Sequence, residues 1–394
     1  MRERFDLPDT TAAAPTARPE EAAARVVPLA AIRSPRPGGT VAMAAVARSV
    51  QASAGNRALR RAARPLLQRR LIATGDVARF IQLVEPAIGL QLHHDPATNE
   101  VTAIGSLATP ATSPHLAAIL TAIMNDASQD AEVNFGRGQD RVAVGAFPIP
   151  PDMTGSRVQR IDLDDVEAIE AGAPGNGLAK FAHEINENYV AHGATAVAGT
   201  SQFPAAHRAG VEAESDVAED LVGPGRRVAE RDAAVPGAVQ TVRVQDFTTY
   251  FLVFTLTPTS TASGTNIAVS NARRASRTVV NTYTIDGFAT GSDALPAGAA
   301  TQAAAALADL TAHPQATAHV IGFTDNVGGA GVNDPLSRRR AERVAAAILA
   351  GGGVGRGSLF VTGRGATGFV AANTTEAGRG HNRRVEITVA EPGP

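Results

Sequence analysis

The chain has 394 residues, a formal net charge of −2 and no cysteine. This length predicts two or three domains, each large enough to bury a core. The near-neutral charge argues against binding of nucleic acid by the whole chain, because such proteins concentrate positive charge against phosphate. Without cysteine, disulfides and thiolate metal sites are excluded.

Residues 1–70 are rich in alanine, proline and arginine, with 13 arginines against five acidic residues. Because the segment lacks a steady hydrophobic period, it predicts a disordered basic leader. The N-terminus also lacks the pattern of a signal peptide, and the sequence has no run of about 20 apolar residues that would predict a transmembrane segment. We therefore expect a protein that is soluble in the cytoplasm and is then delivered to the cell envelope or the exterior without a classical signal peptide.

Part of this leader resembles a known sequence. Residues 51–70, QASAGNRALRRAARPLLQRR, are similar to the "SAGNRAV…LLQR" stretch near the N-termini of proteins encoded beside extracellular contractile injection systems. The resemblance implies that the leader loads the chain into such a phage-tail-like machine, whose components would then be partners and whose firing would supply the export route. The alternative is a solvated linker with one or two short amphipathic helices.

Residues 71–270 have the pattern of a mixed α/β domain. Apolar residues recur at helical spacing in residues 71–92 and 113–127. Residues 131–149 and 238–258 show the period-two alternation of β-strands. Between these segments, potential metal ligands gather in LAKFAHEINENYVAHG, residues 178–193.

On a helix, His183 and Glu187 lie four residues apart and share one face. Glu184 follows His183 directly, so the stretch resembles the helix of zincin metallopeptidases, although Glu187 stands where that family has a second histidine. The resemblance implies a zinc cofactor held by His183, Glu187 and one later residue. Glu184 would then be the general base. The alternative is an ordinary amphipathic helix with a charged face.

The third zinc ligand has three candidates: His192, His207 and Glu214. His192 lies nine residues after His183, which on one helix is a rise of about 13 Å, too far to close the same site. A glycine-containing loop separates His207 from the first helix and can return it as an antiparallel neighbour. We therefore expect the metal ligands to be His183, Glu187 and His207.

The C-terminal part predicts an α+β fold, a two-layer sandwich with the order β-α-β-α-β-β and its helices on one face of the sheet. Three motifs follow one another in this part: G-F-T-D at residues 322–325, N-x-x-L-S-x-x-R-A-x-x-V at residues 333–344, and N-x-T-x-x-G-R-x-x-N-R-R-V-E at residues 373–386. On these motifs, residues 281–392 resemble the OmpA-like peptidoglycan-binding domain, which we place at residues 275–394.

The resemblance also implies a ligand, the diaminopimelate side chain of the peptidoglycan stem peptide. Its free end carries an ammonium and a carboxylate on one carbon. Asp325 is expected to accept hydrogen bonds from the ammonium, and Arg340 to bind the carboxylate bidentately. The other expected residues are Asn333 and Leu336 at the rim, Thr324 supporting the aspartate loop, and Arg384 bracing the pocket from the last strand.

Two functions remain open at this point. The chain is either a non-enzymatic module that anchors an injection-system or envelope protein to the cell wall, or a wall-targeted zinc metallopeptidase or peptidoglycan hydrolase that acts as an effector or toxin. In the second case the enzyme would reside in residues 71–270, because the C-terminal domain is a binding module.

Overall fold

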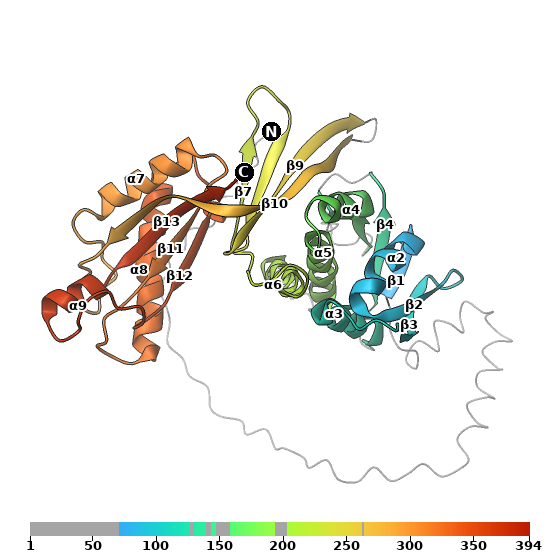
Figure 1. Ribbon diagram of the computed structural model, residues 1–394, viewed down its shortest axis with the longest axis horizontal. Coiled ribbons are helices and arrows are strands. Elements are labelled where there is room, and N and C mark those ends of the chain that lie inside the picture. The colour runs from blue at the N-terminus through green and yellow to red at the C-terminus, as the bar shows by residue number, and fades with distance from the viewer. Residues whose placement is uncertain (1–70, 127–129, 139–142, 147–157, 194–202, 262–263) are drawn as a thin grey trace, which may run out of the picture. The chain divides into compact units, whose positions relative to one another are not determined.

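The computed structural model (Figure 1) describes residues 71–126, 130–138, 143–146, 158–193, 203–261 and 264–394. The leader, for which the composition predicts disorder, lies outside these residues. All of the described residues belong to one compact unit of the chain.

The first part of the fold is a six-stranded mixed sheet with the strand order β2-β3-β1-β4-β6-β5. Strands β1, β4 and β6 are parallel neighbours, and β2, β3 and β5 pair antiparallel at the two edges. Parallel neighbours require crossover connections, and the one from β1 to β4 contains helices α2 and α3. The strands are β1 (Leu71–Gly75), β2 (Leu90–Asp95), β3 (Glu100–Ser106), β4 (Ala131–Gly136), β5 (Gly145–Ala146) and β6 (Gln159–Asp162). The helices are α2 (Val77–Ile88), α3 (Pro114–Asn125), α4 (Leu163–Gly172), α5 (Asn176–Gly193) and α6 (Phe203–Leu221).

The helical spacing predicted over residues 71–92 is correct only for the middle of that segment. The side chain of Asp76 accepts a hydrogen bond from the backbone N–H of Arg79 and begins α2. Gly89, with a left-handed φ of 65°, ends it. The residues on either side are therefore strands β1 and β2, which the apolar spacing alone did not distinguish from a longer helix.

Three phenylalanines fix helix α5 against the sheet. The rings of Phe80 on α2 and Phe135 on β4 stack with centroids 4.3 Å apart, and Phe181 on α5 lies 5.5 Å from Phe80. All three side chains are buried. Because Phe181 and His183 lie on the same helix, this aromatic cluster holds in place the segment that carries the predicted metal ligands.

The second part of the fold is a seven-stranded sheet with the order β12-β11-β13-β10-β9-β8-β7. Its strands are β7 (Ala229–Ala234), β8 (Thr241–Asp246), β9 (Tyr250–Thr261), β10 (Gly264–Ile285), β11 (Thr317–Gly322), β12 (Leu359–Gly363) and β13 (Val385–Pro392). Helices α7 (Ala299–Ala312) and α8 (Ala330–Ala350) bury their apolar faces with this sheet in one core. The predicted order β-α-β-α-β-β is confirmed, with a short helix α9 (Glu376–Asn382) added between the last two strands.

Strand β10 joins the two predicted domains. Its first half pairs with β9 and its second half with β13, and the register shifts between Ser270 and Arg273. The boundary expected between residues 270 and 275 therefore falls inside a continuous strand (Figure 1).

A buried aspartate forms a second connection between the two predicted domains. Asp246, at the end of β8, accepts hydrogen bonds from Thr317 Oγ1 (2.6 Å) and His319 Nε2 (2.9 Å) of β11. It also pairs with Arg277 of β10. Nearby, Arg231 of β7 donates to the carbonyl of Ala316 at 2.8 Å.

In the part of the chain that the structure describes, no helix is both long and apolar enough to cross a membrane.

Candidate functional sites

The three C-terminal motifs meet where β11 ends and α8 begins. Asp325 follows β11 and is 3% exposed. Its Oδ1 accepts a hydrogen bond from the backbone N–H of Val327 (3.0 Å), and its Oδ2 accepts one from Arg383 Nη1 (2.7 Å). We call Asp325, Arg340 and Arg383 the Asp325 site.

Arg340, on α8, lies near enough to this aspartate to interact with its charge, and it donates hydrogen bonds to three backbone carbonyls. It is fully buried, and its Nε, Nη1 and Nη2 donate to the carbonyls of Ser292 (2.8 Å), Phe323 (3.1 Å) and Ala289 (3.0 Å). Burial, followed by the positive charge of Arg383, lowers the pKa of Arg340 to about 10. In this structure Arg340 fixes two backbone segments near Asp325, residues 289–292 and Phe323. Its bidentate role toward a carboxylate stays a prediction.

The other predicted residues of this site are also buried. Asn333 donates to the carbonyl of Gly328 (3.0 Å), and Leu336 is 4% exposed, so neither forms an exposed rim. The reason is helical periodicity, because both share with Arg340 the face of α8 that packs on the sheet. The backbone N–H of Thr324 donates to the carbonyl of Gly365 (2.9 Å), which ties the aspartate loop to the end of β12.

The two consecutive arginines before β13 have separate environments. Arg384 lies over the ring of Phe323 at 4.0 Å and donates to the carbonyl of Gly368 (2.8 Å). Arg383 contacts Asp325 and was given no role by sequence reasoning. Its motif, N-R-R-V-E, could have indicated a role for Arg383, because neighbouring side chains at the start of a strand point in different directions. Only one of the pair could then face Asp325.

The predicted metal ligands come together between helices α5 and α6. The Oε2 of Glu187 lies 2.9 Å from His183 Nε2 and 3.1 Å from His207 Nδ1. The candidate ligand atoms of the three residues all lie within 4.8 Å of one another. We call His183, Glu187 and His207 the histidine–glutamate cluster. His183 and Glu187 are buried, whereas the side chain of His207 is 44% exposed.

Glu214, one of the alternative third ligands, contacts the other nitrogen of His183. Its Oε2 accepts a hydrogen bond from His183 Nδ1 at 2.9 Å, and Glu214 is itself fully buried against Arg227 (2.5 Å) and Lys180 (3.4 Å). Burial raises the pKa of Glu214, but the charges of Arg227 and Lys180 and the bond from His183 outweigh it and hold the pKa well below its usual range. Glu214 thus orients His183 so that Nε2 faces Glu187. The side chain of His192 lies outside the described residues.

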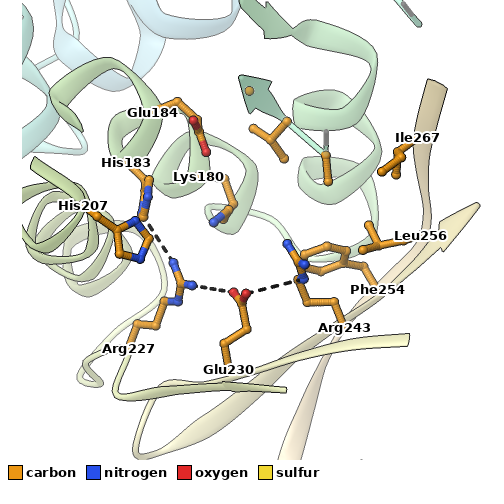
Figure 2. Close-up of a pocket in the computed structure, with 13 residues that line it drawn as sticks. Lys180, His183, Glu184, His207, Arg227, Glu230, Arg243, Phe254, Leu256 and Ile267 are labelled. Carbon is orange, nitrogen blue, oxygen red and sulfur yellow. Dashed lines mark hydrogen bonds and ion pairs between the residues drawn. The ribbon is translucent and has the colours of Figure 1, made fainter. Parts of the chain in front are cut away.

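A pocket of about 210 Å³ opens beside this cluster. Figure 2 shows Glu184 and Lys180 on one side of it and Arg227 and Glu230 opposite. Burial raises the pKa of Glu184, which favours a carboxyl group that can take up a proton. The apolar part of the lining consists of Phe254, Leu256 and Ile267 together with Ala143, Val144 and Gly145.

Comparison with known proteins gives matches to part of the chain. Residues 287–383 match the OmpA family. The probable lipoprotein YiaD of Escherichia coli is 40% identical over 95 residues, which are 24% of this chain and 42% of that protein. The peptidoglycan-binding protein ArfA of Mycobacterium bovis is 44% identical over 80 residues, which are 20% of this chain and 24% of that protein. The chain therefore spans less than half the length of either relative.

Among solved structures, the peptidoglycan-associated lipoprotein from Burkholderia pseudomallei is 26% identical. The match covers 27% of this chain and 88% of that protein, with a TM-score of 0.26.

Proposed function

Residues 287–383 form a domain of the OmpA family, and we propose that through this domain the protein binds peptidoglycan without a covalent bond and anchors the rest of the chain to the cell wall. The observation that carries the proposal is the buried carboxylate of Asp325, which accepts a hydrogen bond from Arg383 at 2.7 Å and lies where the family motifs converge. The printed name of the similar ArfA protein describes peptidoglycan binding and supports the same function.

The proposed ligand is the diaminopimelate of the stem peptide. Its ammonium needs a fixed acceptor, and Asp325 supplies one whose orientation is set by Val327 and Arg383. Arg340 contributes by holding the carbonyls of Phe323 and Ala289 in place around that carboxylate.

The test is co-sedimentation of the full chain with sacculi that contain diaminopimelate. Asp325→Ala removes the acceptor, and Arg340→Ala releases the surrounding loops. We expect each to weaken binding by about 2–5 kcal/mol, which is roughly 30-fold or more. Glu342→Ala, which alters an exposed ion pair on α8, is the control and should bind like wild type. Wild-type co-sedimentation of both site variants would refute the assignment.

We also propose that residues 1–70 load the chain into a contractile injection system. The similarity of residues 51–70 to sequences near such systems supports this role. Deletion of residues 1–70 should block export while wall binding by the remaining chain continues. Unchanged export of the shortened chain would contradict the proposal.

A second candidate function is metal-dependent hydrolysis in residues 71–270, and the convergence of the histidine–glutamate cluster favours it. Two imidazoles and a carboxylate are ordinary zinc ligands, and ligand atoms about 2.1 Å from one ion in tetrahedral geometry lie about 3.4 Å apart. The observed separations of 2.9 and 3.1 Å to Glu187 are hydrogen-bond distances slightly below that spacing, so the three side chains would spread by a few tenths of an ångström around an ion. Zinc held there would supply Lewis-acid chemistry. Glu184 would take up a proton, and Glu214 would keep His183 oriented.

Metal content decides this second function. Full-length protein purified without added metal should contain near-stoichiometric zinc by elemental analysis, and His183→Ala should lose it. His115→Ala, which alters a histidine paired with Asp220, is the matched control and should keep it. Glu184→Gln should keep the zinc but lose hydrolysis of wall fragments. Metal-free wild-type protein would refute the hydrolytic function.

A further inference from the structure

Lysine occurs at a single position of this chain. Of the 36 lysine and arginine residues, only Lys180 is lysine. Its side chain is 8% exposed and lies on α5, three residues before His183, in the lining of the 210 Å³ pocket. Figure 2 shows it extending from the helix into that pocket. The one compact ammonium group of the chain's side chains is therefore enclosed beside the histidine–glutamate cluster.

The ammonium group of Lys180 has donors to spare. Among the described residues, its hydrogen bonds and ion pairs are with Glu214 alone, whose two oxygens both lie 3.4 Å away. Hydrogen bonds from nitrogen usually span about 2.7–3.2 Å. Arg227 is closer to the same carboxylate, at 2.5 Å. Because a buried ammonium with three donors is stabilised by close acceptors, an acceptor that enters the pocket would bind at positions that Glu214 leaves open.

The charges around Lys180 favour an acceptor without a net charge. Three carboxyl groups, those of Glu184, Glu214 and Glu230, lie near enough to interact with its charge. They would repel an incoming carboxylate, whereas a carbonyl oxygen carries only a partial charge. The pocket therefore suits an uncharged amide better than an anion.

The other side of the pocket is apolar. Phe254 and Leu256 of β9 and Ile267 of β10 line it, away from the two histidines (Figure 2). An engineered cavity of about 150 Å³ holds benzene, so a pocket of 210 Å³ has room for a side chain as large as leucine. A ligand that fits both sides has a carbonyl group at one end and an aliphatic group at the other.

We propose that Lys180 donates a hydrogen bond to the carbonyl oxygen of a peptide unit whose aliphatic side chain lies against Phe254, Leu256 and Ile267. As a statement about substrate, this rests on the proposed hydrolysis and deepens it. In that reaction the hydroxyl of water adds to the carbonyl carbon, the C–N bond breaks, and the proton of water leaves with the amine. Lys180 would be a catalytic residue that stabilises the negative charge developing on the oxygen.

The single lysine allows a direct test of binding. Full-length, metal-depleted chain grown with lysine labelled by a carbon isotope at Cε gives one lysine signal by NMR. N-acetyl-L-leucinamide should shift this signal to saturation, with the dissociation constant that calorimetry measures. N-acetylglycinamide, which lacks the aliphatic side chain, should bind about tenfold or more weakly. N-acetyl-L-leucine, whose carboxylate would face the acids, should also bind more weakly than the leucinamide.

Lys180→Met keeps the length of the side chain and removes its donors. It should lower affinity for the leucinamide about tenfold or more, because a hydrogen bond to a charged group is lost. The matched control is Arg226→Met, which removes a cation that pairs with Asp216 at 2.7 Å outside the pocket lining. This variant should bind like wild type. A melting curve would show whether Lys180→Met folds.

Three results would overturn the inference: no binding of the leucinamide by wild type, an unshifted lysine signal at saturation, or wild-type affinity in a folded Lys180→Met. The titration of wild type decides the question even if Lys180→Met does not fold. Because the chain is metal-depleted, the outcome is independent of zinc content. Absence of zinc from the purified protein would refute the hydrolysis and leave the peptide binding standing.

Discussion

Replacement of Asp246 by asparagine should weaken the connection between β8 and β11 by an amount that depends on pH. Asp246 is fully buried and accepts hydrogen bonds from Thr317 and His319 while pairing with Arg277. Asparagine keeps the shape of the side chain but removes its charge. The variant therefore isolates the electrostatic part of the interaction.

The pKa of Asp246 gives the magnitude. Burial raises this pKa, but the bond and charge of His319 and the charge of Arg277 outweigh it and lower the pKa from 3.8 to about 2. A shift of nearly two units corresponds to roughly 2–3 kcal/mol, at about 1.4 kcal/mol per unit. Because the pKa is lower in the folded than in the unfolded chain, this contribution is complete above about pH 5 and is lost as the pH falls toward 2.

Urea unfolding of the full chain at pH 7 and at pH 2.5 measures the effect. Asp246→Asn should be less stable than wild type by roughly 2–3 kcal/mol at pH 7, and the difference should fall below about 1 kcal/mol at pH 2.5. Asp232→Asn, which alters an exposed pair with Arg243 in the same sheet, should change stability by less than about 1 kcal/mol. Equal differences for Asp246→Asn at both pH values, or none at pH 7, would refute the electrostatic explanation.

Three further outcomes are expected. Gly322→Ala should lower the melting temperature, because a Cβ at this position would lie 1.9 Å from the carbonyl oxygen of Ser337, and overpacking of this kind costs about 1–3 kcal/mol. Gly145→Ala should reduce hydrolysis while zinc content stays unchanged, because its Cβ would lie 2.6 Å from Glu184 Oε2 and displace that carboxylate. If the histidine–glutamate cluster binds zinc, zinc at 100 times its dissociation constant should stabilise the metal-depleted chain by about 2.7 kcal/mol, and an unchanged melting curve would contradict binding.

Much of the C-terminal domain could be predicted, because its signals are local. The apolar stripe of α8, which includes Leu336, Val344 and Ile348, is buried as the helical spacing indicates. The approach of His183, Glu187 and His207 also followed from simple geometry. Two of these residues lie one turn apart on one helix, and the loop before the third is long enough to return the chain.

The unpredicted features depend on contacts between distant segments. The motif marks Arg340 as a residue of the site. Its partners Ala289 and Ser292, however, lie about 50 residues away in an irregular segment whose path depends on the whole fold. Similarly, nothing local in residues 264–285 indicates that one strand serves two halves of a sheet. Apolar periodicity likewise did not separate strand from helix in residues 71–92, where Asp76 and Gly89 set the boundaries.

The shared strand β10 determines how the protein carries mechanical load. Its two halves pair with different strands, β9 for the first and β13 for the second. When the C-terminal domain is held and the chain before β9 is pulled, tension enters β9 at Tyr250, which pairs with Ser276 of β10. The pairing with β13 begins at the next residue, Arg277. The β9–β10 ladder is therefore loaded at one end, and its hydrogen bonds would open one after another from that end.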